Sequence, residues 1–343
     1  MTTSAWGDPI TKHFFALTPN EVLAAIEEAG YRCTGLCYPL GSYENRVYEV
    51  EVEEDPSRGI VKKDVSSLRR VVKFYRPGRW TREQILEEHQ FLAELSENEV
   101  PVIVPLPLSE GKTLGTNKQT GLFYALFPKV GGRAPEDLSE DQFQWLGRLL
   151  GRLHNVGAAK LAPHRVRLTP ETYGLSNLNY LLEQNQLPAE MRPAYEAAVR
   201  EICRLSEPLF AKTKTLRIHG DCHAGNILWG KSGPFLLDFD DMVMGPAAQD
   251  LWLLLPGRDE EGKAALEALL EGYGQMRGFD REELRLIEPL RALRFVHYSA
   301  WLARRWSDPA FPRAFPHFGT PKYWGEMTRD LQQQAVLVRE VLG

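Results

Sequence analysis

The stretch that decides the fold is residues 216–241, which read Leu-Arg-Ile-His-Gly-Asp-Cys-His-Ala-Gly-Asn-Ile-Leu-Trp-Gly-Lys-Ser-Gly-Pro-Phe-Leu-Leu-Asp-Phe-Asp-Asp. Its first residues have the pattern of a short strand that runs into a polar loop. Two apolar runs, 227–229 and 235–237, then stand on either side of a Gly-Lys-Ser-Gly turn, and this arrangement predicts a β-hairpin. The polar side chains of the loop are His219, Asp221, His223 and Asn226.

The predicted hairpin gathers oxygen ligands at its open end. If the turn closes the hairpin, Asn226 stands opposite Leu237 or Asp238. One amide and one carboxylate then meet beside a second carboxylate, that of Asp221. Such a set suits Mg²⁺, which keeps some of its waters and takes further ligands from phosphates. The stretch therefore predicts a phosphoryl-transfer site.

Three other interpretations of this stretch fit less well. Residues 225–232 match the P-loop pattern G-x-x-x-x-G-K-[ST], but a P-loop needs a helix after it, and here another strand is predicted. A zinc site at His219, Cys222 and His223 lacks a second group of ligands, and Gly220 disfavours a helix there. Ordinary turn residues would not bring so many kinds of chemically active side chain into eight positions.

Length and composition describe a globular protein of two lobes. The chain has 343 residues, of which 43% are hydrophobic and 25% charged, with a formal net charge of −5. We expect a nucleotide-binding lobe over residues 1–128 and a catalytic and substrate lobe over 129–343. The acidic balance gives no reason to expect nucleic acid as a partner, and no apolar run is long enough to span a membrane. We expect a cytoplasmic monomer with reduced cysteines, in which Cys33 and Cys37 pack rather than bind a metal.

The first lobe should be a small sheet with helices. Capping boxes and periodicity predict helices over 19–29 and 82–96, strands over 31–40, 46–52, 68–75 and 121–128, and an exposed excursion over 53–67. Lys73 lies in the third strand, and Glu88 lies near the centre of the apolar face of the second helix. A carboxylate at such a position is costly unless it is paired, so Lys73 is its expected partner. The alternative is that both side chains are ordinary exposed residues.

The second lobe should be mainly helical. The segment 128–132 is the expected hinge, and helices are predicted after Ser139 and over about 188–206, 262–274 and 281–306. We interpret His154 as a packing residue. For Asp250 we prefer the role of a helix cap. The alternative is that it braces the polar loop of residues 219–226, which we call the catalytic loop. Four side chains of the last helix either contact an acceptor or form a solvated face: Arg294, His297, Trp301 and Arg305.

The motif His219-Gly-Asp-Cys-His-Ala-Gly-Asn226, followed by Asp238-Phe-Asp240, resembles the aminoglycoside and choline phosphotransferases, which are relatives of the protein kinases. Long further stretches, among them 41–48, 71–77 and 245–252, narrow the resemblance to a bacterial Ser/Thr protein kinase branch of that group. The resemblance covers most of the chain. It implies an α+β bilobal protein-kinase-like fold and an ATP-dependent kinase.

The resemblance also implies roles for individual residues. Asp221 would orient the acceptor hydroxyl and accept its proton, while Asn226 and Asp238 would hold Mg²⁺ between the phosphates of ATP. Lys73 and Glu88 would position the α- and β-phosphates, and the loop around Ser42 would cover them. His223 would stand beside the transferring phosphate as a cation or bond to Asp221.

Departures from the kinase pattern bear on the acceptor. The phosphate-covering loop has the single glycine Gly41, and only about a dozen residues separate Asp238 from Asp250, so we expect no switching by phosphorylation of an activation loop. This short segment favours a small-molecule alcohol, of the homoserine, choline or aminoglycoside type. The long family match favours a protein Ser/Thr kinase, which is the function we expect. A nucleotide-binding pseudokinase is disfavoured because Asp221, Asn226 and Asp238 are all present.

Overall fold

The computed structural model describes residues 9–64, 66–230 and 233–342, without the side chains of 9, 10 and 342. The chain forms two compact units. The first contains the chain up to Ala134 together with Ile227–Asp240, and the second contains Pro135–Asn226 and the chain from Asp241 onward. The predicted boundary after residue 128 lies a few residues before this transition. The hairpin of 227–240, which we expected in the second lobe, belongs to the first unit.

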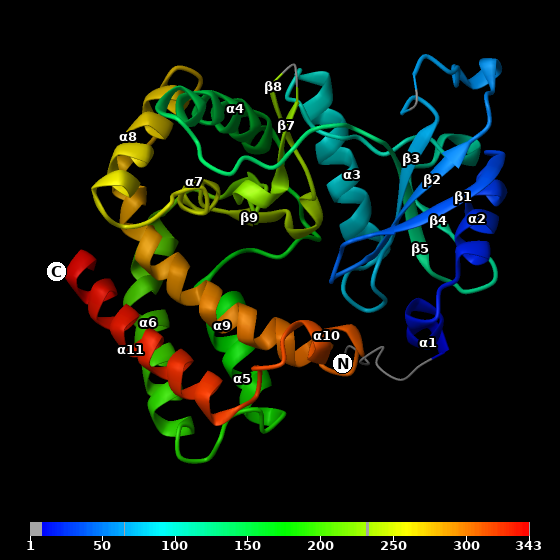
Figure 1. Cartoon of the computed structure of the whole chain (residues 1–343). Helices are drawn as coiled ribbons and strands as arrows, with labels where there is room; N and C mark the ends of the chain where they lie inside the picture. Colours follow the sequence, from blue (N-terminus) through cyan, green and yellow to red (C-terminus); the bar gives the residue numbers. More distant parts are fainter. Residues whose placement is uncertain (1–8, 65, 231–232, 343) are drawn as a thin grey trace. The chain divides into compact units, whose positions relative to one another are not determined.

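The first unit is built on an antiparallel sheet of order β1-β2-β3-β5-β4 (Figure 1). Its strands are β1 (Cys33–Leu40), β2 (Arg46–Val52), β3 (Arg69–Phe74), β4 (Gly115–Thr116) and β5 (Phe123–Pro128). In the register of this sheet Lys73 stands between Val47 on one side and Ala125 on the other. All the predicted strands are present, and the short β4 is the one addition among them. In the described residues of the excursion over 53–67, the chain forms a short 3-10 turn, Pro56–Arg58, and an isolated antiparallel bridge between Asp55 and Ile60.

Helices of the first unit begin at the predicted caps. α2 (Pro19–Glu28) and α3 (Arg82–Glu97) each start with a complete capping box, at Thr18 and Thr81. α1 (Pro9–Phe15) was not predicted. α2 supplies buried side chains to a core that it shares with the strands, including Val22, Ile26, Val50, Val72 and Leu126.

The predicted hairpin forms from β7 (Ile227–Gly230) and β8 (Gly233–Leu236). Ile227 pairs with Leu236 and Gly230 with Gly233, which is the register on which the ligand prediction depends. Residues 231 and 232 of the predicted turn lie outside the described part of the chain. The segment that would be a P-loop is a 3-10 turn, Ala224–Asn226, followed by strand β7, so the P-loop interpretation fails.

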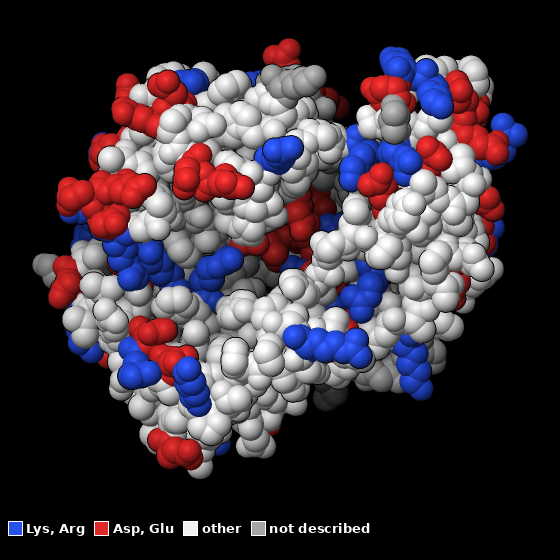
Figure 2. All heavy atoms as spheres, in the orientation of Figure 1, with Lys and Arg blue, Asp and Glu red and all other residues white. Residues whose placement is uncertain are grey.

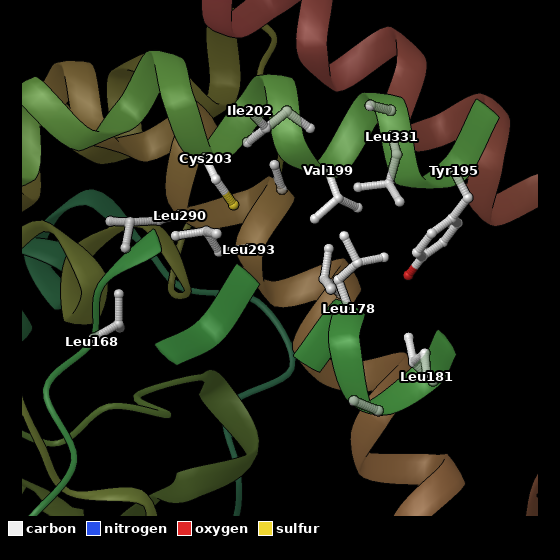
Figure 3. Packing of buried hydrophobic residues seen from close by; sticks show 14 of the residues in the cluster. Leu168, Leu178, Leu181, Tyr195, Val199, Ile202, Cys203, Leu290, Leu293 and Leu331 are labelled. Atoms are coloured by element: carbon white, nitrogen blue, oxygen red, sulfur yellow. The ribbon is translucent and has the colours of Figure 1, made fainter. Parts of the chain in front are cut away.

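The second unit is mainly helical. Its helices are α4 (Glu140–Ala159), α5 (Ser176–Glu183), α6 (Arg192–Lys212), α7 (Ala248–Trp252), α8 (Glu260–Gly274), α9 (Ile287–Arg305), α10 (Ala310–Ala314) and α11 (Pro321–Leu342). A π-helical turn, Pro170–Leu175, precedes α5, and a 3-10 turn, Arg281–Leu286, precedes α9. Side chains of α5, α6, α9 and α11 form the core in Figure 3, where Leu178, Val199, Leu293 and Leu331 are among those labelled. The sequence did not predict α5, α10 or α11.

The strand before the catalytic loop has a partner that we did not predict. β6 (Leu216–Ile218) pairs with β9 (Val243–Gly245), so Ile218 stands opposite Val243. Gly220 then turns the chain with φ of +85°, and a Cβ there would lie 2.1 Å from the carbonyl oxygen of Asp241. Only glycine fits this close approach, because a Cβ would collide with backbone. The turn fixes where the catalytic loop begins.

Charged side chains are distributed over both units. Figure 2 shows acidic and basic residues interspersed on the visible face of each unit, as expected for a chain with 41 Lys and Arg against 46 Asp and Glu. Among the helices that the structure describes, none combines the length and the apolar character needed to cross a membrane.

Candidate active site

A buried lysine in the first unit is surrounded by carboxylates. Lys73 Nζ lies 3.0 Å from Asp240, 3.3 Å from Asp238 and 3.6 Å from Glu88. The predicted pairing of Lys73 with Glu88 is thus confirmed, although Asp240 is the nearer partner. Burial alone would lower the pKa of Lys73, but these acids outweigh it and raise the pKa well above its ordinary value. The lysine is a fixed cation at neutral pH.

Asp240 has a second cationic partner. Arg79 Nη1 lies 2.8 Å from Asp240 Oδ2, and Arg79 also contacts Glu44 of the loop before β2 at 2.9 Å. Asp240 is 2% exposed, so its charge needs both partners to remain in the interior. Its ion pairs tie the segment after β8 to Lys73 of the sheet and to Arg79.

A cavity of about 280 Å³ opens beside Lys73 and Glu88 in the first unit. Its walls come from the sheet, α3 and the hairpin, and are mostly apolar: Leu40, Val47, Val71, Leu92, Ile103, Phe127, Leu228 and Leu236 are among them. An apolar cavity with a few convergent charged groups is the usual form of a site for a small planar ligand. Ser42, from the loop expected to cover phosphates, accepts a hydrogen bond from the backbone of Asn45 at 3.3 Å and does not line this cavity.

Asp238 is held in an unusual backbone conformation. Its φ is +53°, in the left-handed region that side chains other than glycine seldom adopt. Its side chain is 55% exposed, in contrast to the buried Asp240 two residues later. Backbone strain of this kind is concentrated at functional sites. The conformation leaves the Asp238 carboxylate accessible to a ligand while Lys73 holds one of its oxygens.

In the second unit the catalytic loop presents Asp221 between two basic side chains. Arg294 Nη1 of α9 donates to Asp221 Oδ1 at 2.8 Å, and His223 Nε2 lies 3.5 Å from Oδ2. His223 Nδ1 accepts a hydrogen bond from Gly225, so the proton of a neutral ring is on Nε2, toward Asp221. Burial would raise the pKa of Asp221, but the His223 hydrogen bond and the Arg294 charge outweigh it and lower the pKa well below its usual range.

Asn226 has the orientation that a metal ligand requires. Its Nδ2 donates to the backbone carbonyl of Asp221 at 2.9 Å, which fixes the side chain against the catalytic loop. Within the described residues, Asn226 Oδ1 accepts no hydrogen bond from protein. An amide oxygen that is fixed and still available fits a hard cation. The same bond ties Asn226 to Asp221.

Asp250 braces the catalytic loop and does not cap a helix, so our preferred interpretation was wrong. Its carboxylate accepts the backbone N–H groups of His219 and Gly220, both at 2.8 Å. α7 begins at Ala248, with Asp250 inside its first turn and no side-chain cap at Ala247. Residues 219 and 250 are far apart in the sequence, so no local pattern indicated this contact.

His154 is buried with both ring nitrogens in polar contacts, as predicted, and it also contacts Asp250. Its Nε2 lies 3.1 Å from Asp250 Oδ2, and its Nδ1 lies 2.9 Å from the hydroxyl of Tyr273. Asp250 and His154 are both fully buried. A line of contacts thus runs from α8 through α4 and α7 to the catalytic loop.

The zinc interpretation finds no support. In the described parts of the chain no three His, Cys, Asp or Glu side chains are grouped as a metal site. Cys222 is fully buried, and burial raises the pKa of its thiol well above the ordinary value, so it does not supply a thiolate. His219 is also fully buried, and its Nδ1 accepts the backbone N–H of Asp221 at 3.3 Å.

Curated relatives resemble this protein over nearly its whole length. Stress response kinase A of Escherichia coli strain K12 is 42% identical over 328 residues, which cover 95% of each chain. The serine/threonine protein kinase RdoA of Salmonella typhimurium strain LT2 is 41% identical over the same coverage. Such identity over 95% of each chain indicates a common family and not a shared motif alone.

Solved structures share the fold at lower identity. The amicoumacin kinase hAmiN, in complex with AMP-PNP, Ca²⁺ and Ami, matches with a TM-score of 0.68 and 20% identity over 89% of each chain. A microcompartment-associated aminopropanol kinase matches with a TM-score of 0.65 and 19% identity over 95% of this chain and 98% of that one. The predicted α+β, kinase-like fold is confirmed.

The family model described as the phosphotransferase enzyme family matches residues 37–287, which include the catalytic loop, the hairpin and the Lys73 cluster. The prediction of a kinase is confirmed, since the relatives that match over the full length carry that name. The chain belongs to the phosphotransferase enzyme family and is a kinase.

Proposed function

We propose that this protein is an ATP- and Mg²⁺-dependent Ser/Thr protein kinase that transfers the γ-phosphate to a protein hydroxyl. The observation that carries the proposal is the catalytic loop, in which Asp250 holds the backbone and Asn226 holds the carbonyl of Asp221. Phosphoryl transfer depends chiefly on positioning and on neutralising charge, and such a loop serves both needs.

The first unit supplies the nucleotide side of the proposal. Lys73 would bind the α- and β-phosphates, with Glu88 as the partner that keeps it in place. The apolar cavity beside them suits an adenine ring. We also assign to the loop around Ser42 the covering of the phosphates. These roles agree with the lysine's fixed charge and with its position at the cavity wall.

Asn226 and Asp238 are the proposed Mg²⁺ ligands. An amide oxygen with no protein partner among the described residues and an exposed carboxylate are the donors that a hard cation takes in kinases. When bound, Mg²⁺ neutralises charge on the β- and γ-phosphates. Lys73 Nζ lies 3.3 Å from Asp238 Oδ1, so a metal bound there would share the carboxylate with the lysine.

Asp221 would accept the hydrogen bond of the acceptor hydroxyl and then its proton. His223 orients the Asp221 carboxylate through Oδ2 and adds positive charge near the transferring phosphate when protonated. The hydroxyl oxygen forms the new bond to phosphorus, the bond to the bridging oxygen of ADP breaks, and ADP leaves.

A protein acceptor is favoured by the relatives, which are named as a stress response kinase and a serine/threonine protein kinase. The second candidate is a small-molecule alcohol kinase, because the solved neighbours include an aminopropanol kinase and a spectinomycin phosphotransferase. Arg294 beside Asp221 disfavours cationic acceptors such as aminoglycosides, since like charges repel. We further propose that the protein acts in the cytoplasm as a monomer.

Labelled ATP separates these functions. The purified protein is incubated with ATP and Mg²⁺ together with casein, a histone, or a panel of small alcohols, beside an Asp221→Ala variant. Label on protein that is lost in the variant supports the proposal, and turnover only with an alcohol supports the second candidate. Binding of ATP without any turnover would reject both. Measuring ATP binding to Asp221→Ala shows whether the variant keeps its nucleotide site.

A further inference from the structure

Arg294 pairs with one of the two carboxylate oxygens of Asp221. Nη1 of Arg294 donates to Oδ1, while His223 faces Oδ2, so both carboxylate oxygens have protein partners. Arg294 is 40% exposed and comes from α9, whereas Asp221 is 23% exposed. Within the described chain, Asp221 is the one carboxylate in an ion pair with Arg294. A substrate must therefore displace this contact or share it.

A second arginine on the same face of α9 is held by neutral groups. Arg304 Nη1 donates to Asn177 Oδ1 at 2.7 Å, and its guanidinium lies 4.2 Å from the ring centre of Tyr180. Over the residues described, no acidic side chain forms an ion pair with Arg304, and burial lowers its pKa. A half-buried cation held by neutral groups is a ready site for an anion.

Aromatic and polar groups lie along α9 between the two arginines. His297 stacks on Tyr173 with ring centres 4.4 Å apart, and its Nδ1 lies 3.2 Å from Asn177 Nδ2. Positions 294, 297, 301 and 304 recur at helical spacing, so they share one face. Arg294 and Arg304 are about 15 Å apart along the axis at 1.5 Å per residue. That length suits several residues of an extended peptide.

We propose that this face of α9 is the acceptor site and that it selects peptides with acidic side chains near the target Ser or Thr. The inference rests on the proposed protein kinase function. An acidic side chain beside the target draws Arg294 away from Asp221 Oδ1 and leaves that oxygen for the hydroxyl. A second acidic group, farther along the peptide, binds Arg304. The hydroxyl proton then moves to Asp221 as the oxygen bonds to the γ-phosphorus and ADP leaves.

The charge of the site also excludes other acceptors. A peptide with lysine beside the target would bring an ammonium group toward Arg294, and a lysine several residues farther along would bring one toward Arg304. Repulsion of that kind gives specificity in addition to the attraction for the correct partner. An acidic neighbour gains a charge-assisted hydrogen bond, which is among the stronger polar contacts. The two effects act in the same direction.

The test compares peptides that differ only in charge. Serine peptides with Glu, Ala or Lys at the flanking positions are phosphorylated by the wild type and by Arg294→Gln, Arg304→Gln and Arg339→Gln. The last is the control, because Arg339 is an exposed arginine of α11 paired with Glu201. Melting curves of all four proteins show whether each variant is folded.

We expect the wild type and Arg339→Gln to favour the Glu peptide over the Lys peptide by about tenfold or more in kcat/KM. Arg304→Gln should reduce this preference several-fold, chiefly by raising KM for the Glu peptide. Arg294→Gln should reduce it as well and change kcat, and raising salt should weaken the wild-type preference. Equal use of the peptides, or an unchanged preference in both variants, overturns the inference. Absence of Asp221-dependent labelling of any peptide overturns the proposed function with it.

Discussion

Asp250 accepts the backbone N–H of Gly220 at 2.8 Å across 30 residues of sequence. A second bond, to the N–H of His219, uses the other carboxylate oxygen, so one buried side chain fixes two consecutive peptide groups. These peptide groups directly precede Asp221. The position of Asp221, the proposed catalytic carboxylate, is thus set from outside its own loop, by a residue of α7.

The first prediction is that Asp250→Asn slows catalysis more than it weakens binding of ATP. An asparagine offers one acceptor oxygen and places an N–H₂ group against the other backbone N–H, so one bond is lost and a repulsive contact appears. We expect kcat to fall at least tenfold and stability to fall by about 1–3 kcal/mol, the cost of an unsatisfied buried group. Steady-state kinetics at varied ATP concentration measure kcat and KM, and thermal melting measures stability.

The matched control is Asp259→Asn, which changes an exposed aspartate that caps α8 through Gly262. It should cost up to about 1 kcal/mol of stability and leave kcat unchanged. If Asp250→Asn behaves like this control, Asp250 has no role in positioning the loop.

The second prediction concerns Lys73. Lys73→Met should raise KM for ATP and lower kcat, because the phosphates lose their cation. The variant also leaves Glu88, which is 1% exposed, without its ammonium partner. We expect the free energy of unfolding to fall by about 3 kcal/mol at pH 7, as when one partner of a buried ion pair is removed. The fall should be smaller at pH 5, because a buried carboxyl group that has lost its cation can take up a proton.

Lys73→Met combined with Glu88→Gln tests the origin of that loss. The double variant should recover much of the stability but none of the activity, because the neutral amide no longer needs a cation. Chemical denaturation at both pH values supplies the comparison. No recovery in the double variant would show that Asp240, and not Glu88, carries the cost.

A third prediction links stability to the ionisation of Glu283. Burial raises the pKa of Glu283 from 4.5 to about 7, although the N–H of Ala248 donates to it at 2.8 Å. Between pH 4.5 and 7 the unfolded chain has lost this proton while the folded protein keeps it. The folded state is therefore progressively disfavoured as pH rises through this window. The effect is on the order of 2 kcal/mol, since the carboxyl retains some contact with water.

Glu283→Gln removes the titrating group and keeps an acceptor for Ala248 N–H. Plotted against pH from 4.5 to 7.5, the free energy of unfolding should fall less steeply in the variant than in the wild type. Parallel curves would mean that Glu283 titrates as an ordinary glutamate. Glu282→Gln, an exposed neighbour in the same 3-10 turn, serves as the control.

The fourth prediction is that the cysteines react slowly with alkylating reagents. Burial is the main cause that raises the pKa of Cys33 to about 12 and that of Cys203 to about 12, and burial also raises the pKa of Cys37 and Cys222. Little thiolate is present at pH 8, so iodoacetamide should modify the folded protein far more slowly than free glutathione. Mass spectrometry over time, with the unfolded protein as reference, measures the rates. Fast labelling of Cys33 would contradict the expectation that Cys33 and Cys37 are packing residues.

Sequence reasoning succeeded where the signals were local. The capping box at Thr81 and the apolar stripe of α3 predicted the buried position of Glu88 before any partner was known. The two apolar runs around the glycine turn predicted the register that pairs Ile227 with Leu236. In these cases periodicity and turn chemistry act within one or two neighbouring elements.

Sequence reasoning failed where a contact joins segments that are distant in the chain. Arg294 meets Asp221 across 73 residues, and no pattern in either segment points to the other. β9 is three residues long and was not recognised, because a strand that short has no measurable alternation. The role of Asp250 was misjudged for a related reason, since an aspartate near a helix start is usually a cap.

The last prediction is that Gly272→Ala destabilises the second unit while Gly274→Ala, two residues along α8, does not. A Cβ at Gly272 would lie 2.0 Å from the carbonyl oxygen of Gln144 on α4, whereas nothing lies within 4 Å of a Cβ at Gly274. Backbone must therefore move to accept the first alanine, and we expect a loss of about 2–4 kcal/mol, larger than usual for one added methyl group. The second alanine should be neutral or stabilise by up to about 1 kcal/mol, because alanine is the better helix former. Because α8 carries Tyr273, whose hydroxyl contacts His154, Gly272→Ala should also lower kcat by disturbing the support of Asp250. Equal melting temperatures for the two variants would show that α4 and α8 are not as closely packed as these glycines indicate.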